Sequence, residues 1–210
     1  MRRRSRHDPE SGVLVDLLRH GQPEGGALLR GSRDDALSPL GWAQMWGAVG
    51  SSCPWSRIVS SPLRRCAEFA GALARHHGLP FAIDDRLREM HFGELEGLNT
   101  AQPPAADSGA VLRLWSDPAT YTAPGGESFA SLRHRVLESW RSHCVRPADG
   151  HVLLIVHGGP IRVILGEVLE LAPPALARVE VPHAALSRVR VWEEPADRIC
   201  ASLVFHAGRL

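Results

Sequence analysis

Residues 15–26 read VDLLRHGQPEGG, an apolar run that ends in an arginine, a histidine and a glycine. The run from Leu14 to Leu18 predicts a buried strand, and the segment from Gly21 to Ala36, rich in glycine and charge, predicts a long loop of the kind that often carries function. Arg19 and His20 therefore lie where a buried strand meets a loop.

A second stretch repeats this pattern far along the chain. Residues 151–156, HVLLIV, are typical of a parallel strand buried on both faces, and His157-Gly158-Gly159-Pro160 follows before a helical pattern. Carboxyl ends of parallel strands form the ligand crevice of open α/β sheets, and helix N-termini there offer N–H groups to anions. One histidine after a strand is more often structural, but two with an adjacent arginine favour a functional site.

Strand and helix patterns alternate along the rest of the chain. Ser38-Pro39 and Ser61-Pro62 each combine an N-cap residue with a proline suited to the first helical position. We expect helices from both starts and over 127–145 and 161–168, and strands at 14–18, 55–60, 81–83, 151–156, 186–192 and 201–205. This order predicts a three-layer α/β fold, with a mainly parallel central sheet and helices on both faces.

The amino-acid composition limits the classes of protein to which this chain can belong. The 210 residues, 44% hydrophobic and 22% charged, predict a globular chain with one domain over 13–210 and a flexible basic tail over 1–12. A net charge of +1 gives no basis for nucleic-acid binding, and no apolar stretch approaches the roughly 18 residues of a membrane span. We therefore expect a cytoplasmic protein without nucleic-acid or membrane partners, and the oligomeric state stays open.

The residue types exclude several kinds of chemistry. All 24 residues counted as Lys+Arg are arginine, which rules out a lysine Schiff base and the lysine of a Walker loop. The four cysteines are widely spaced, with no pattern of metal ligands, and predict free thiols in a reducing compartment. We expect no metal and no other cofactor, so that arginine would hold any bound phosphate.

Two further segments carry candidate groups. SSPLRRC (60–66) places Arg64 and Arg65 on the first turn of a predicted helix, where the helix dipole disfavours cations unless an anion is present. LREMHFGELEG (87–97) carries Glu89, Glu94 and Glu96 in a loop, although most such carboxylates are simply exposed.

Five stretches in order resemble the motifs of the histidine phosphatase superfamily, also called phosphoglycerate-mutase-like: LLRHG (17–21), SSPLRRC (60–66), LREMHFGELEG (87–97), PGGES (124–128) and LIVHGG (154–159). RHG alone is a weak signal, but the ordered set is specific. The resemblance runs from about Val13 to Val191 and implies that family's fold and a phosphoryl-transfer activity.

The resemblance also implies residue roles. His20 would be the nucleophile that forms a phosphohistidine, and Glu89 would protonate the leaving oxygen and then activate water. The groups that would hold the phosphoryl oxygens are Arg19, Arg65 and His157. Phosphoryl transfer depends on positioning and on neutralising equatorial oxygens, for which the fork of a guanidinium is suited.

Substrate contacts are predicted at three further positions, Gln22, Arg30 and Gly158. Gln22 stands where many family members have glutamate, and the following PEGGALLRG (23–31) departs from the usual polar continuation. Phe69 stands where a threonine is common. The Pro/Ala/Asp/Gly-rich stretch 101–109 predicts a flexible excursion, with 101–124 as a candidate lid.

Within the superfamily, residues 25–45 together with HFGELEG and PGGESFASLRHRV look like the α-ribazole-5′-phosphate phosphatases of cobalamin nucleotide-loop assembly. We therefore expect hydrolysis of that small-molecule phosphomonoester. The alternatives are a broad-specificity phosphatase of the same superfamily, a phosphoglycerate mutase and a non-catalytic module that binds a phosphorylated ligand. A metal-dependent hydrolase that uses the 11 histidines lacks ligand spacing.

Overall fold

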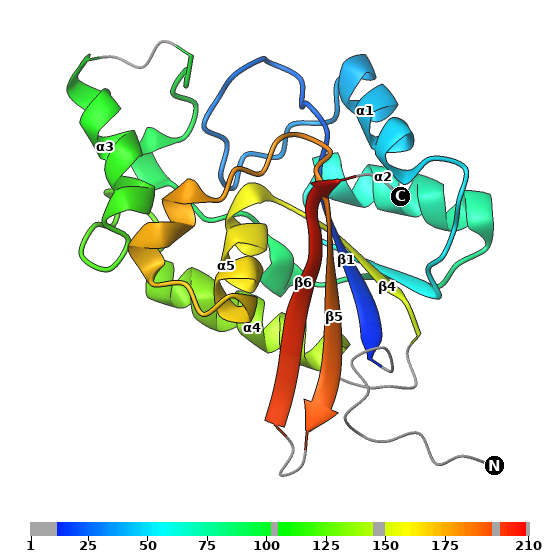
Figure 1. Ribbon diagram of the computed structural model, residues 1–210. Coiled ribbons are helices and arrows are strands. Elements are labelled where there is room, and N and C mark those ends of the chain that lie inside the picture. The colour runs from blue at the N-terminus through cyan, green and yellow to red at the C-terminus, as the bar shows by residue number, and fades with distance from the viewer. Residues whose placement is uncertain (1–11, 102–104, 145–149, 195–197, 209–210) are drawn as a thin grey trace, which may run out of the picture.

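One sheet of six strands forms the centre of the computed structural model (Figure 1), which describes residues 12–101, 105–144, 150–194 and 198–208. The strands are β1 (Val13–Arg19), β2 (Arg57–Ser60), β3 (Phe81–Ile83), β4 (Val152–Val156), β5 (Leu186–Glu194) and β6 (Arg198–Gly208). Their order is β3-β2-β4-β1-β5-β6. The first four are parallel to one another, β5 pairs antiparallel with β1, and β6 pairs antiparallel with β5.

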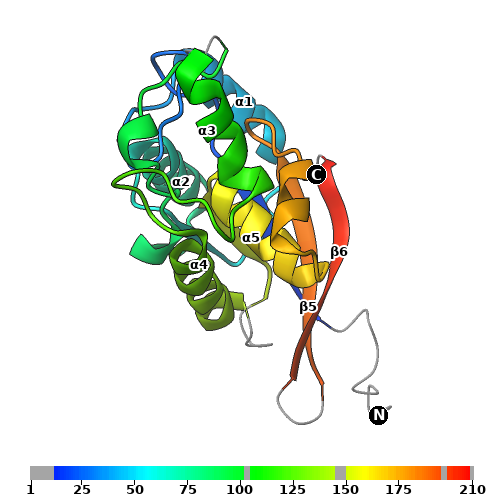
Figure 2. The same ribbon diagram turned by 90° about the vertical axis from the view of Figure 1, so that its left-hand side faces the viewer.

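Helices cover both faces of this sheet (Figures 1 and 2). α1 (Pro39–Val49) and α2 (Arg64–His77) lie on one face, and α4 (Phe129–Cys144) and α5 (Gly158–Val168) lie on the other. α3 (Ala105–Ser116) packs against the short 3₁₀ helix Pro173–Arg178, and further 3₁₀ turns span Asp85–Leu87 and Gly93–Leu95. The predicted three-layer α/β fold is confirmed.

Side chains that alternate along the central strands build two apolar cores, one under each helical layer. Leu17 and Leu154 pack with α4 and α5, whereas Leu18 and Leu153 pack with α1 and α2. Because neighbouring strand residues point to opposite faces, a continuous apolar run serves both cores at once.

Most of the predicted elements are present. Ser38 caps α1 by accepting a hydrogen bond from the Gly41 N–H at 3.0 Å, with Pro39 as the first helical residue. The predicted start of the next helix at Ser61-Pro62 is wrong, because Leu63 is the N-cap of α2 and the Ser61 hydroxyl is bonded to His157 instead.

The expected excursion over 101–109 is also wrong in part. Residues 105–109 belong to α3, while 102–104 lie outside the described residues. Most of the basic tail predicted over 1–12 lies outside them too, as does Val145 at the end of the helix expected over 127–145. No helix in the described ranges combines the length and hydropathy needed to cross a membrane.

Candidate active site

The register of the two central strands brings the two strand-end histidines together. Arg19 of β1 pairs with Val156 of β4, so the next residue of each strand, His20 and His157, emerges at the same carboxyl edge. Their ring centroids lie 5.1 Å apart in an edge-to-face arrangement, and both side chains are buried.

Hydrogen bonding fixes the tautomer of His20. Its Nδ1 lies 2.8 Å from the carbonyl oxygen of Gly21, which can only accept, so Nδ1 carries the hydrogen. Nε2 is then the nitrogen with a free lone pair. Burial, followed by the charges of Arg65 and Arg19, lowers the pKa of His20 well below 6.5. His20 is therefore a neutral imidazole with a nucleophilic nitrogen at neutral pH.

His157 is neutral for similar reasons. Arg65 Nε donates to His157 Nδ1 at 3.3 Å, which leaves the hydrogen on Nε2, 2.7 Å from Ser61 Oγ. Burial, Arg65 and His20 lower the pKa of His157 well below 6.5. The Cys66 thiol lies 3.6 Å from Nε2, and burial raises its pKa, so Cys66 contributes no thiolate here.

Arg19 carries the least satisfied donor of the site. Its guanidinium donates to the Val181 carbonyl, but its Nε–H is buried and has no hydrogen-bond partner in the part of the chain that the structure describes. A buried donor without a partner costs roughly 1–3 kcal/mol. Burial lowers the pKa of Arg19 to about 10, which leaves it charged at neutral pH. A cation with an unused donor beside a neutral nucleophile fits an anionic ligand.

Arg65 connects the histidines to the loop that follows β1. It is 1% exposed and donates to the carbonyls of Gly31, at 2.8 Å, and Arg33, in addition to His157. Among the described residues, three of its five N–H donors thus have a partner, which leaves two for a ligand. Arg64 points outward and pairs with Glu68 on the helix surface.

Glu89 lies at the N-terminus of α5. Its carboxylate accepts from the Gly159 N–H at 3.0 and 3.2 Å, so the positive end of the helix holds it. A Cβ added at Gly158 would lie 3.2 Å from Arg162 Nη1, 3.8 Å from Glu89 Oε2 and 3.9 Å from Arg19 Nε. Gly158 thus marks the point where the carboxylate and two guanidinium groups converge, and a side chain there would crowd them.

Arg135 of α4 fixes the backbone that carries Glu89. Its guanidinium donates to the carbonyls of Arg86 (2.8 Å), Arg88 (2.7 Å) and Glu89 (3.1 Å), and Glu127 neutralises it with two contacts of 2.7 Å. This explains the PGGES stretch, because Glu127 holds the arginine that holds the Glu89 loop. The sequence analysis did not single out Arg135. The signal in the sequence was that this charged residue lies next to the apolar face of the predicted helix.

The three residues predicted to contact substrate have different surroundings in the structure. Gly158 lies at the site, and the backbone of Gln22 packs against α1, with its N–H donating to Gln44 Oε1 at 2.8 Å. Arg30 is 8% exposed and bonds within its own loop. Its partners are Asp35 Oδ2 and the carbonyls of Leu28, Gly26 and Glu24. These contacts make Arg30 a brace of the loop and leave it one spare donor.

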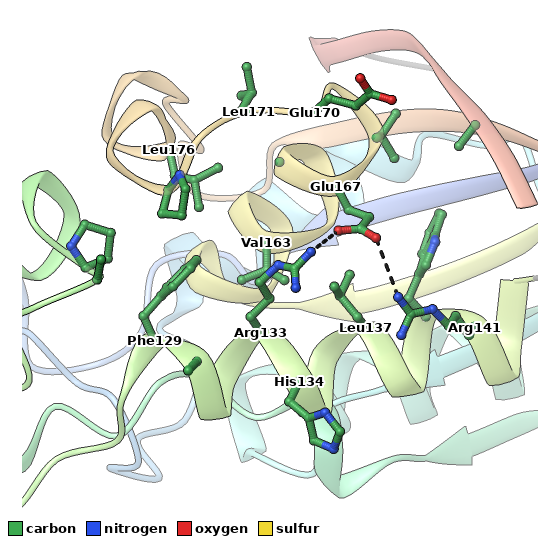
Figure 3. Close-up of a pocket in the computed structure, with 18 of the residues that line it drawn as sticks. Phe129, Arg133, His134, Leu137, Arg141, Val163, Glu167, Glu170, Leu171 and Leu176 are labelled. Carbon is green, nitrogen blue, oxygen red and sulfur yellow. Dashed lines mark hydrogen bonds and ion pairs between the residues drawn. The ribbon is translucent and has the colours of Figure 1, made fainter.

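A cavity of about 1460 Å³ lies away from this cluster, between α4, α5 and β6 (Figure 3). It is lined by residues such as Leu137, Trp140 and Val163, and Arg133 and Arg141 reach across it to Glu167. None of the convergent site residues lines it. Among the described residues, no group of three or more His, Cys, Asp or Glu side chains is arranged to hold a metal ion.

The family model of the histidine phosphatase superfamily (branch 1) matches residues 15–197. The chain belongs to the histidine phosphatase superfamily. A bifunctional protein of Mycobacterium tuberculosis is 32% identical over 188 residues, which make up 87% of this chain and 51% of the relative. The chain thus spans about half the length of the first curated relatives that it matches.

Other relatives match over more of their length. Glucosyl-3-phosphoglycerate phosphatase of M. tuberculosis is 37% identical over 168 residues, 74% of each chain. The solved structure of the mycobacterial enzyme with VO3 has a TM-score of 0.74 and 33% identity, and the match covers 91% of this chain and 96% of that one. α-Ribazole phosphatase from Shigella flexneri has a TM-score of 0.75 at 19% identity, covering 94% and 97%, which is a likeness of fold alone.

Proposed function

We propose that this protein is a phosphomonoesterase that acts without a metal ion, through a phosphohistidine on His20. The observation that carries the proposal is the pairing of a neutral His20, whose Nε2 is free to attack, with the buried, unpartnered Nε–H of Arg19 in the described part of the chain. Donors aimed in advance at developing oxyanion charge are the main contribution that a protein makes to phosphoryl transfer.

The reaction has two balanced steps. His20 Nε2 attacks phosphorus, the ester P–O bond breaks, and Glu89 in its acid form gives its proton to the departing oxygen. Water then attacks the phosphohistidine while the Glu89 carboxylate takes the water's proton, which releases inorganic phosphate and restores both residues. Arg19 and Arg65 supply the positive charge that the equatorial oxygens need, and the Gly159 N–H keeps the Glu89 carboxylate beside them.

The substrate has two candidates, each with its own support. Glucosyl-3-phosphoglycerate is favoured by the 37% identity to its mycobacterial phosphatase. α-Ribazole 5′-phosphate is favoured by the likeness of residues 25–45, whereas the solved α-ribazole phosphatase shares 19% identity and supports the fold alone. We place glucosyl-3-phosphoglycerate first, because 37% identity over 74% of the chain is stronger support than a likeness of flanking segments.

A kinetic screen in excess chelator tests the proposal. We expect the chelated protein to hydrolyse p-nitrophenyl phosphate, and the kcat/KM for glucosyl-3-phosphoglycerate to exceed that for α-ribazole 5′-phosphate by roughly 100-fold, a difference of about 2.7 kcal/mol in transition-state binding. Similar kcat/KM values for every ester would contradict specificity for one substrate and favour a broad-specificity phosphatase. Loss of turnover in chelator would contradict the metal-free chemistry. Binding of phosphate without any turnover would favour the non-catalytic module.

A further inference from the structure

His183 lies next to the nucleophile, in the segment that joins the 3₁₀ helix Pro173–Arg178 to β5. Three hydrogen bonds hold this segment against the end of β1. The Ala184 N–H donates to the His20 carbonyl at 3.1 Å, the Arg19 N–H donates to the Ala185 carbonyl at 3.0 Å, and the Arg19 guanidinium donates to the Val181 carbonyl. The position of His183 relative to His20 is therefore fixed by the backbone on both sides of it.

The imidazole of His183 faces the imidazole of His20. The ring centroids lie 5.6 Å apart with an interplanar angle of 42°. His183 is half-buried and its ring contacts the ring of His20, and within the described part of the chain neither of its ring nitrogens has a hydrogen-bond partner. Both nitrogens are therefore available to water or to a ligand in the site.

The backbone beside His183 adopts a costly conformation. Ala184 has a φ of +55°, a left-handed conformation that costs a residue with a Cβ about 1–2 kcal/mol. Strain of this kind persists where the surrounding structure imposes it, and it concentrates at functional sites. The N–H of this same residue donates to the His20 carbonyl, which holds His183 beside the nucleophile.

Charge determines which form of His183 is present. Burial, with Arg19 and Arg30 nearby, lowers its pKa to about 4. The ring is therefore neutral at neutral pH and offers one N–H donor and one acceptor nitrogen. A neutral ring can contact the neutral His20 ring without repulsion.

We propose that His183 is a further catalytic residue of this site, which donates a hydrogen bond to an equatorial oxygen of the phosphoryl group during its transfer to and from His20. The inference rests on the proposed phosphohistidine chemistry. In an in-line displacement the leaving oxygen lies on the far side of phosphorus from the nucleophile, whereas equatorial oxygens project sideways. A ring that flanks the nucleophile's own ring at 5.6 Å is placed for a sideways oxygen and not for the leaving group.

The test compares His183→Leu, which removes the donor, with His183→Gln, which keeps an N–H donor. His134→Gln, an exposed histidine of α4, is the matched control. We expect His183→Leu to lower kcat/KM by roughly 100-fold. The loss should be equal for p-nitrophenyl phosphate and an alkyl phosphate, because an equatorial contact does not depend on the leaving group. The Gln variant should recover at least about tenfold of that loss, and orthovanadate should bind the Leu variant at least about tenfold more weakly, with Tm unchanged.

Each other outcome overturns the inference. Activity of His183→Leu within about threefold of the starting protein would show that the ring touches no reacting group. A loss confined to one leaving group would place His183 at the leaving group. A loss of kcat/KM with unchanged vanadate affinity, or with no recovery in the Gln variant, would show that His183 only packs against His20. The His20→Ala variant distinguishes a failure of this inference from a failure of the proposed function. If that variant stays active, the reaction does not pass through a phosphohistidine on His20, and the proposed function itself fails.

Discussion

The cavity between α4 and α5 and the carboxyl edge of the sheet contrast in how their charges are satisfied. The cavity is roomy, about 1460 Å³, yet the arginines that cross it, Arg133 and Arg141, are both paired with Glu167. At the sheet edge, Arg19 keeps a buried donor without a partner in the described ranges, and two imidazoles are held neutral by burial and adjacent guanidinium groups. The difference shows that unspent hydrogen-bonding capacity identifies reactive chemistry better than volume does.

The largest expected difference between the two regions is in turnover. His20→Ala should lower kcat by at least about 1000-fold, because removing a nucleophile leaves only the contribution of binding and positioning. Arg133→Met, in the cavity, should leave kcat unchanged and alter the free energy of unfolding by less than about 1 kcal/mol, since its ion pair is exposed. Steady-state kinetics and urea denaturation of both variants check this. A catalytic loss at Arg133 would make the cavity part of the active site.

Glu89→Gln should slow the hydrolysis of an ester with a poor leaving group more than that of an ester with a good one. We expect a loss of roughly 100-fold or more on an alkyl phosphate, whose alkoxide needs a proton to depart. The loss in the phosphorylation step should be far smaller on p-nitrophenyl phosphate, whose phenolate leaves readily. Single-turnover kinetics on the two esters measure that step. Equal losses would remove Glu89 from the role of general acid.

Arg135 and Arg133 form a matched pair on one helix, since each is paired with a glutamate but only Arg135 holds the Glu89 backbone. Arg135→Gln should lower kcat on an alkyl phosphate by roughly 30-fold, because a small displacement of a catalytic group is costly. Arg133→Gln should change it by less than about twofold. Arg135→Lys, with Tm measured in parallel, separates loss of positioning from loss of fold. Equal behaviour of the two Gln variants would show that the contacts of Arg135 with the loop do not position Glu89.

The depressed pKa values of His20 and His157 predict a pH-dependent stability. Below pH 6.5 the unfolded chain protonates these histidines while the folded chain keeps them neutral, so the free energy of unfolding falls as pH falls. Each histidine accounts for about 1.4 kcal/mol between pH 7.5 and 5.5. His20→Ala should therefore lose about 1.4 kcal/mol less than the unmodified chain over that interval, in urea denaturation without phosphate buffer. An identical loss in both would mean that folded His20 titrates normally.

Local patterns predicted much of this arrangement. A strand followed by His-Gly is a short-range signal, so the sequence alone places His20 and His157 at one edge of the sheet, and Arg19, Arg65 and Glu89 followed from the motifs. The whole of α3 was missed, because its first residues, 105–109, combine a glycine with polar residues and show no helical period. Their helix gains tertiary support from the 3₁₀ helix Pro173–Arg178.

Contacts between distant parts of the chain could not be predicted in the same way. Arg135 reaches carbonyls 46 to 49 positions away, and Arg30 turned back on its own loop where a ligand contact was predicted. His183 lies far from His20 in sequence and reaches it only through the pairing of β5 with β1. The periodicity of a sequence carries no information about which backbone carbonyls a side-chain donor will reach in the folded protein.

The most direct test of phosphohistidine chemistry is to trap the intermediate. Glu89→Gln should accumulate it on p-nitrophenyl phosphate, because that ester phosphorylates the enzyme with little acid help while hydrolysis of the intermediate loses its base. Quenching the variant in alkali during turnover and analysing its peptides by mass spectrometry locates the added phosphoryl group. We expect one phosphoryl group on His20, stable in alkali and lost in acid. Phosphate on Ser60, Ser61 or His183, or turnover without any phosphorylated protein, would contradict it.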